Sequence, residues 1–135
     1  MSEENKELFR RFVDEVVNPG ASDRMEEFVA PEYVEHATDT HGPDGYRQNH
    51  EKILAAFPDF HVEIEKIIAE GDMLAFRLTY SGTHRGEFRG IAPTGKKVSW
   101  ASMQFRRVAD GMFVESWGLS DTQGLLETLS EGSSE

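Results

Sequence analysis

The chain has 135 residues, 38% of them hydrophobic and 29% charged, which is typical of one globular domain. It contains no cysteine, which excludes disulfides, a cysteine nucleophile and thiolate metal sites. The 25 acidic and 14 basic residues give a net charge of −11, which disfavours nucleic acid or an anionic membrane as a partner because both attract cationic patches.

The sequence predicts a cytoplasmic protein with one domain. No apolar run approaches the roughly 18 residues that span a bilayer. The first residues lack the cationic and apolar regions of a signal peptide. We expect the domain to cover residues 1–130 and the polar residues 131–135 to form a disordered tail.

The first half of the chain carries helical patterns. Apolar residues recur at helical spacing up to a break at residues 18–20, after which Ser22 is placed to cap a second short helix. Residues 33–36 are expected to be extended. Pro43 suits the first turn of a third helix that runs to about Phe57.

The second half changes to the alternating pattern of strands. The expected elements are strands near 62–67, 74–80, 84–88, 97–108 and 112–120, followed by a helix near 122–129. Helices that precede an antiparallel meander are typical of α+β domains. We therefore expect a curved, cone-shaped antiparallel sheet with three N-terminal helices that enclose a pocket.

The dipeptide Asp110-Gly111 between the last two strands is a strong hairpin signal. With these as the turn residues, the expected cross-strand pairs are Gln104–Trp117, Trp100–Asp121 and Arg106–Glu115. This register would place two tryptophans, an amide and a carboxylate on one face, as in the lining of a ligand site. The opposite face would carry Ala101, Met103, Phe105 and Val114 and is expected to be core or a subunit contact.

Asp121 is the candidate general base, because an apolar setting raises a carboxylate's pKa toward working pH. The alternative is that Asp121 only caps the helix that begins at Thr122.

Several motifs resemble those of a known family. They are Ala56-Phe57-Pro58-Asp59, the segments 82–88 and 90–96, Asp110-Gly111, Glu115, Trp117, Asp121 and Gly124-Leu125-Leu126. Together with the order of elements along the chain, they resemble the SnoaL-like polyketide cyclases of the nuclear-transport-factor-2-like superfamily.

The resemblance implies a reaction without a metal or an organic cofactor. An acidic residue, here Asp121, would remove an acidic C–H proton from a polyphenolic polyketide, and the enolate would close a ring by intramolecular aldol attack. His36 matches a histidine that recurs after the second helix and would be a second acid–base group. The family also has an assisting histidine on the penultimate strand, whereas the last histidine here is His84, and Arg106 lies two residues beyond Gln104.

The site predicted on these grounds combines an apolar wall with a few polar groups. Its catalytic residues are Asp121 and His36, its ligand-binding residues are Trp117, Gln104, Trp100, His50, Tyr33 and Phe57, and it contains no metal. Each has a structural alternative: the tryptophans can be plain core, and His36 and His50 can be neutral packing histidines. His84 is expected to be structural, and the polar residues of 35–41 are expected to form a loop rather than a metal site.

The leading function is therefore proton abstraction next to a carbonyl of a small hydrophobic ligand, with Asp121 assisted by His36 or Gln104. A binding module that holds such a ligand without turnover is the main alternative. A hydrolase or isomerase that uses Asp121 with Arg106 or Arg77 is another, and it requires an arginine inside the pocket. We expect a homodimer that packs through the outer sheet face.

Overall fold

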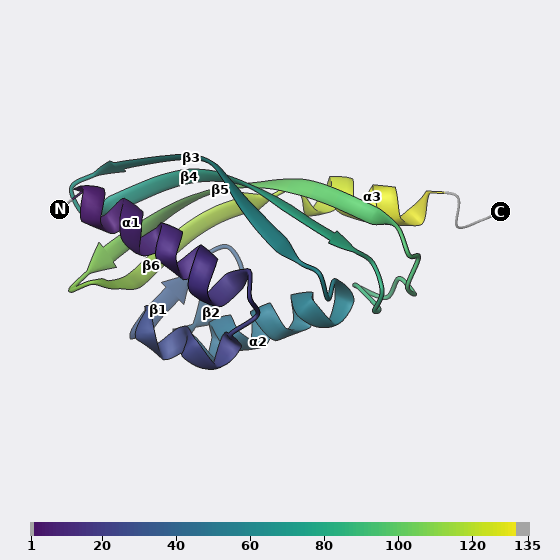
Figure 1. Cartoon of the computed structure of the whole chain (residues 1–135), viewed down its shortest axis with the longest axis horizontal. Helices are drawn as coiled ribbons and strands as arrows, with labels where there is room; N and C mark the ends of the chain where they lie inside the picture. The colour runs from purple at the N-terminus through teal and green to yellow at the C-terminus, as the bar shows by residue number, and fades with distance from the viewer. Residues whose placement is uncertain (1, 132–135) are drawn as a thin grey trace.

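A computed structural model describes residues 2–131 of the chain, and the expected tail lies outside the described residues from residue 132 onward. The domain is α+β, as predicted (Figure 1). In chain order its elements are α1 (Ser2–Phe12), a π-helical turn (Val13–Val17), a 3-10 helix (Ser22–Glu27), β1 (Val29–Glu35), β2 (Thr40–His41), α2 (Gly42–Ala56), β3 (His61–Glu70), β4 (Met73–Thr83), β5 (Lys97–Ala109), β6 (Met112–Ser120) and α3 (Thr122–Ser130). Within the described residues, no helix has the length and apolar character to cross a membrane.

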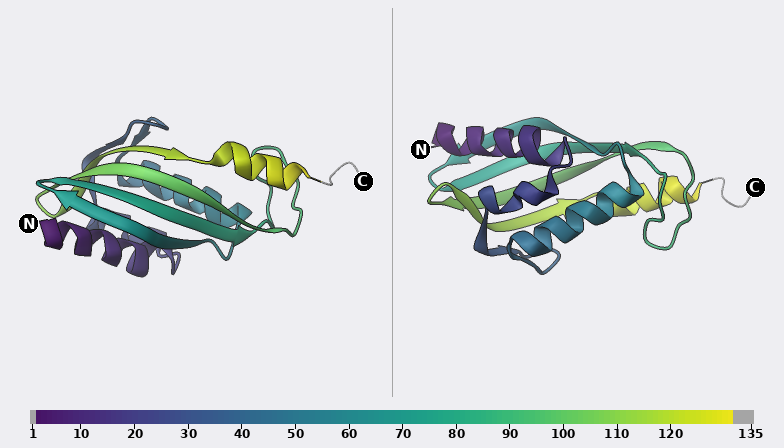
Figure 2. Two further views of the ribbon diagram at one scale, coloured as in Figure 1. Left: turned by 90° about the horizontal axis from the view of Figure 1, so that it is seen from above. Right: turned by 60° about the horizontal axis from the view of Figure 1, so that its bottom comes forward.

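One six-stranded sheet, in the order β2-β1-β6-β5-β4-β3, organises the molecule. Its pairs are antiparallel except that β1 runs parallel to β6. The sheet curls, and α1 and α2 lie under its concave face, whereas α3 continues from the end of β6 (Figures 1 and 2). The predicted curved sheet with helices across its open side is confirmed.

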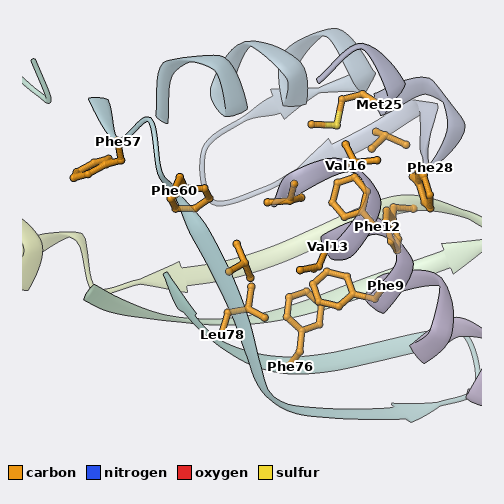
Figure 3. Packing of buried hydrophobic residues seen from close by; sticks show 14 of the residues in the cluster. Phe9, Phe12, Val13, Val16, Met25, Phe28, Phe57, Phe60, Phe76 and Leu78 are labelled. Atoms are coloured by element: carbon orange, nitrogen blue, oxygen red, sulfur yellow. The ribbon is translucent and has the colours of Figure 1, made fainter. Parts of the chain in front are cut away.

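Aromatic side chains fill the space between α1 and the sheet. Phe9 and Phe12 are buried, and the ring of Phe9 stacks on that of Phe76 from β4 with 4.0 Å between centroids (Figure 3). Full burial of such a side chain contributes roughly 1.5–3 kcal/mol. The helical spacing of apolar residues in α1 therefore fixes this helix to the concave face.

The break after the first helix is confirmed and has a structural partner. Asn18 ends the π-helical turn, and its side chain bonds the backbone of Val62 twice, at 3.1 Å to the carbonyl oxygen and 2.7 Å from the N–H. Gly20 follows with a φ of 76°, which favours glycine. These bonds join the end of the helix to the start of β3.

Two predictions about local structure are wrong. Ser22 does not cap a helix, because its hydroxyl bonds Nδ1 of His50 at 2.7 Å. Residues 84–88 do not form a strand, and only an isolated bridge between Phe88 and Ile91 is present. The reason is that the N–H groups of residues 85 and 86 bond the Ala56 carbonyl at the end of α2 instead of a neighbouring strand.

Candidate functional site on the inner sheet face

The predicted hairpin turn is confirmed, but the predicted register is wrong beyond its first two pairs. Asp110 and Gly111 have φ values of 52° and 73°, as a type I′ turn requires. The ladder pairs Val108 with Phe113 and then Arg107 with Glu115, so Val114 is an extra residue. Such a bulge moves every later pair by one position, which exchanges the two faces of β6.

The bulge separates residues that were expected together. Trp117 pairs with Phe105 on the outer face, and Gln104 pairs with Gly118. Asp121 does not lie opposite Trp100, because its N–H bonds the Ala101 carbonyl at 2.8 Å. The inner face of β5 nevertheless carries the expected alternation of Trp100, Ser102, Gln104 and Arg106.

A chain of polar side chains crosses this inner face. Arg106 donates from Nη2 to Oε1 of Gln104 at 2.9 Å. Gln104 donates from Nε2 to the Tyr80 hydroxyl at 3.0 Å and to Oγ of Ser102 at 2.9 Å. The Ser120 hydroxyl donates to Oγ of Ser102 at 3.1 Å. The network therefore runs from the interior to the last residue of β6.

Arg106 is the least expected member of this network. It is 2% exposed and does not pair with Glu115 as predicted, because the bulge brings Glu115 against Arg107 instead, at 3.1 Å. Its guanidinium carbon lies 4.9–5.5 Å from the ring centroids of Phe9, Tyr46, Phe76 and Phe113. Period-2 alternation with Gln104 would have indicated an inward side chain.

Tyrosine hydroxyls surround the same region. Arg106 donates to the Tyr46 hydroxyl at 3.3 Å, and the ring of Tyr33 lies 5.6 Å from that of Tyr46. Burial raises the pKa of Tyr33 and of Tyr80, so both hydroxyls remain protonated near neutral pH. Tyr46 and Tyr80 follow the apolar periodicity of their elements, and nothing in the sequence indicates that their hydroxyls belong to a polar network.

The structure brings two residues of the expected apolar wall, Phe57 and Trp100, together at the other end of the inner face. Phe57 is fully buried, and its ring lies 5.2 Å from that of Trp100. Trp100 also contacts Tyr80 edge-on at 5.6 Å. Phe57, Trp100 and Tyr80 thus connect the aromatic core to the polar network.

His36 and Trp117 lie together on the outer side of the sheet. Their rings stack at 5.2 Å with 16° between planes, and Nε2 of His36 bonds Glu115 at 2.8 Å. The His36 bond, with help from Arg107, lowers the pKa of Glu115. The structure does not bring His36 and Trp117 to Gln104 and Trp100.

Asp121 is exposed at the junction between β6 and α3. It is the N-cap of α3, and its Oδ1 accepts the Gly124 N–H at 3.0 Å. Ser120, the residue before it, belongs to the inner-face network. Asp121 therefore stands where the polar chain reaches the surface.

The other histidines are held by local bonds. His50 is buried, with Nδ1 bonded to Ser22 at 2.7 Å and Nε2 to the Val17 carbonyl at 3.1 Å. His84 is fully buried, and its Nδ1 accepts the Thr94 N–H at 3.2 Å. Across residues 2–131, no group of three or more histidine and acidic side chains is placed to hold a metal ion.

Two hollows on the surface lie away from the inner-face network. One, of about 600 Å³, runs between α1 and β3 and is lined by residues that include Arg10, Asp14 and Lys66. The other, of about 640 Å³, lies between the start of α1 and the 110–111 turn. Both are rich in charged residues at the surface and lack the convergent polar groups of the inner face.

Comparison with known proteins gives consistent results. The chain is 28% identical over 119 residues to nogalonic acid methyl ester cyclase from Streptomyces nogalater, covering 84% of this chain and 89% of that protein. It is 29% identical over 128 residues to aklanonic acid methyl ester cyclase AcmA from Streptomyces galilaeus, covering 90% of this chain and 88% of that protein.

The fold agrees with solved structures. The chain superposes on AclR from Streptomyces galilaeus, described as a candidate hydroxylase, with a TM-score of 0.87 and 32% identity, covering 97% of this chain and 83% of that one. This likeness confirms the nuclear-transport-factor-2-like fold. The family model of SnoaL-like polyketide cyclases matches residues 7–129. The chain therefore belongs to the SnoaL-like polyketide cyclase family.

Proposed function

We propose that the protein is a cofactor-free enzyme that removes a proton next to a carbonyl of a small hydrophobic, polyketide-like ligand. Membership of the cyclase family implies a small-molecule ligand. The observation that carries the proposal is the buried polar network of the inner face, which ends at Ser120 beside Asp121. Asp121 is the general acid/base and Gln104 assists, whereas His36, the other expected assistant, lies beside Trp117 on the outer side of the sheet.

The chemistry needs a base and donors for the enolate oxygen. Removal of a C–H proton leaves negative charge on the neighbouring carbonyl oxygen, which fixed N–H and O–H donors stabilise. The Tyr80 hydroxyl can be such a donor on the inner face, because it accepts from Gln104 and has its own O–H to give, whereas both N–H groups of Gln104 already donate to Tyr80 and Ser102 and hold that hydroxyl in place. Asp121 caps α3 with Oδ1, and one carboxylate oxygen suffices for a cap, so the second oxygen is available for proton transfer.

The capping geometry and exposure of Asp121 favour a second candidate, a binding module without turnover. In such a module Asp121 only stabilises α3, and the inner face holds a ligand unchanged. The burial of Arg106 supports a third candidate, the hydrolase or isomerase, because such an enzyme requires an arginine on the inner face of the sheet. Arg77 is exposed and pairs with Met103 on the outer face.

Asp121→Asn separates these candidates, because asparagine caps a helix about as well as aspartate but is not a base. The assay is cyclisation of aklanonic acid methyl ester or nogalonic acid methyl ester, with the product measured by chromatography. We expect the kcat of Asp121→Asn to be at least about 100-fold below that of the wild type. The affinity for the ester should stay the same. Asp110→Asn, at the hairpin turn, is the matched control and should keep full activity.

Two results would contradict the proposal. Full turnover by Asp121→Asn would remove Asp121 from the chemistry. Tight binding of both esters by the wild type without any cyclised, rearranged or hydrolysed product would favour the binding module.

A further inference from the structure

Arg106 is a buried cation without an anion. It lies near the middle of β5, is 2% exposed, and forms no ion pair with a carboxylate of the described residues. Nη2 donates to Gln104 and to Tyr46, whereas Nε and Nη1 have no hydrogen-bond partner. Three of its five N–H groups are therefore without an acceptor.

Folding alone does not account for this arrangement. Removing a guanidinium from water costs several kcal/mol, and arginine cannot escape the cost by losing its proton. The four surrounding aromatic rings offset part of that cost through cation–π attraction. Rings are poor substitutes for the oxygen acceptors that unpaired N–H groups need.

Two buried hydroxyl groups from strands β6 and β1 also lack a hydrogen-bond partner among the described residues. Ser116 of β6 is the cross-strand neighbour of Arg106 and is fully buried. Tyr33 of β1 is 1% exposed and packs on Tyr46. The hydroxyls of Tyr33 and Ser116 form no hydrogen bond among the described residues. Three strands thus contribute buried donors on one face, without a carboxylate among them.

We propose that Arg106, Tyr33 and Ser116 bind the carboxylate of an otherwise apolar acid, so that the protein binds such an acid more tightly than its neutral methyl ester. A single guanidinium balances a single negative charge, whereas a phosphate dianion would need more cationic partners. The rings of Phe9, Phe76 and Phe113 lie 4.9–5.4 Å from the guanidinium carbon, so the part of the ligand next to its carboxylate should be apolar. The inference rests on the proposed function in that the ligand lies against the inner face.

The names of the two curated relatives state a different kind of substrate from the free acid proposed here. Both are named as cyclases of a methyl ester, in which the acid is masked and neutral. A neutral ester would leave the charge of Arg106 without a counter-charge. The proposed preference is therefore for the acid over its own methyl ester.

A pair of probes with the same ring tests the inference. Binding of 2-naphthoate and of methyl 2-naphthoate to the whole chain would be measured by titration calorimetry at neutral pH. The wild type should bind the acid about tenfold more tightly than the ester, or better. Arg106→Met should lose that preference and retain the ester affinity. Arg77→Met, which removes an exposed arginine from the outer face, should keep the preference.

A more conservative variant protects the test against a folding defect. Tyr33→Phe removes one donor and keeps the ring, and it should weaken binding of the acid severalfold without changing that of the ester. Thermal unfolding of Arg106→Met should show a stability equal to or above that of the wild type, because an unpaired buried charge is removed.

Several results would overturn the inference: equal affinity for acid and ester, an acid preference that persists in Arg106→Met and in Tyr33→Phe, or no binding of either probe. The inference and the proposed function can fail separately. Asp121→Asn should retain the acid preference, so a preference for the acid without any turnover would overturn only the enzyme proposal. Turnover without the preference would overturn only the carboxylate site.

Discussion

At the scale of single residues, His50 combines burial with two hydrogen bonds of fixed direction. The Val17 carbonyl can only accept, so Nε2 of His50 carries the proton and Nδ1 accepts from the Ser22 hydroxyl. The ring is thus neutral in this arrangement, and a second proton, on Nδ1, would reverse the Ser22 bond and place a charge in a buried position. Burial accordingly lowers the pKa of His50 from its ordinary value of 6.5.

This histidine should make the stability depend on pH. Because the pKa in the folded state is lowered, the unfolded chain takes up the proton first as the pH falls. The stability contributed by neutral His50 is complete above pH 6.5 and is lost as the pH falls toward the lowered pKa. When the pH is lowered from 8 to 5, the free energy of unfolding measured in urea should therefore fall less for His50→Gln than for the wild type. His61→Gln, at an exposed histidine, is the control, and an unchanged slope in His50→Gln would contradict the prediction.

Residues that follow a simple period could be predicted from the sequence. Trp100 and Gln104 face inward because alternation along one strand does not depend on its partner. Trp117 could not be placed in this way, because its face depends on the bulge at Val114, and valine has no property that marks a bulge. The same alternation turns Arg106 inward, but its lack of a carboxylate partner could not be predicted, because the expected pair with Glu115 is removed by the same bulge.

At the scale of elements, the junction of β6 and α3 is built around Gly124. The Cβ of any larger residue at position 124 would lie 2.4 Å from Oδ2 of Asp121 and 2.9 Å from its Cγ. Atoms cannot approach so closely, so the observed position of the Asp121 carboxylate requires a glycine at position 124. The start of α3 is thereby coupled to the proposed acid/base.

Gly124→Ala should therefore behave differently from the same change in an ordinary helix. Alanine normally stabilises a helix by about 1 kcal/mol relative to glycine. Here the displaced cap should cost a similar amount, so urea unfolding should show no net gain, and kcat should fall with the shift of Asp121. Gln123→Ala, in the same helical turn, should keep the stability and the kcat of the wild type. A Gly124→Ala protein with higher stability and full activity would contradict the coupling.

The boundaries of the elements were largely predictable where glycine, proline or asparagine marks them. Pro43 lies in the first turn of α2, and Asp110-Gly111 forms the hairpin turn. The segment 84–88 was not predictable, since its backbone bonds the end of α2, a contact between distant parts of the chain. Gly86 permits it, because a Cβ there would lie 2.1 Å from the Ala55 carbonyl oxygen.

At the scale of the whole molecule, the outer face of β5 and β6 is unusually apolar. Leu119, Met103 and Phe105 are 81%, 62% and 58% exposed, and Trp117 is 37% exposed. The ladder makes Met103 the neighbour of Leu119 and Phe105 the neighbour of Trp117, so the four form one patch. Contiguous apolar patches on a sheet face are typical of subunit contacts.

The homodimer stays a prediction, and this patch is the proposed contact. The wild type should have twice its chain mass of 15.3 kDa in light scattering coupled to gel filtration. Leu119→Lys should shift the protein to the monomer mass, because a lysine in the contact would be buried without a partner. Glu51→Lys, on the exposed surface of α2, is the control and should remain dimeric. A wild type of monomer mass at micromolar concentration would overturn this assembly.

The extra residue at Val114 has a consequence for how this hairpin tolerates changes in length. Phe113 and Glu115 already occupy consecutive places in the ladder, so deleting Val114 would leave every later pair intact. A deletion between Glu115 and Ser120 would instead turn all following side chains to the opposite face. Natural or engineered insertions and deletions in β6 should therefore accumulate at this one position, where the strand can change length without exchanging its inside for its outside.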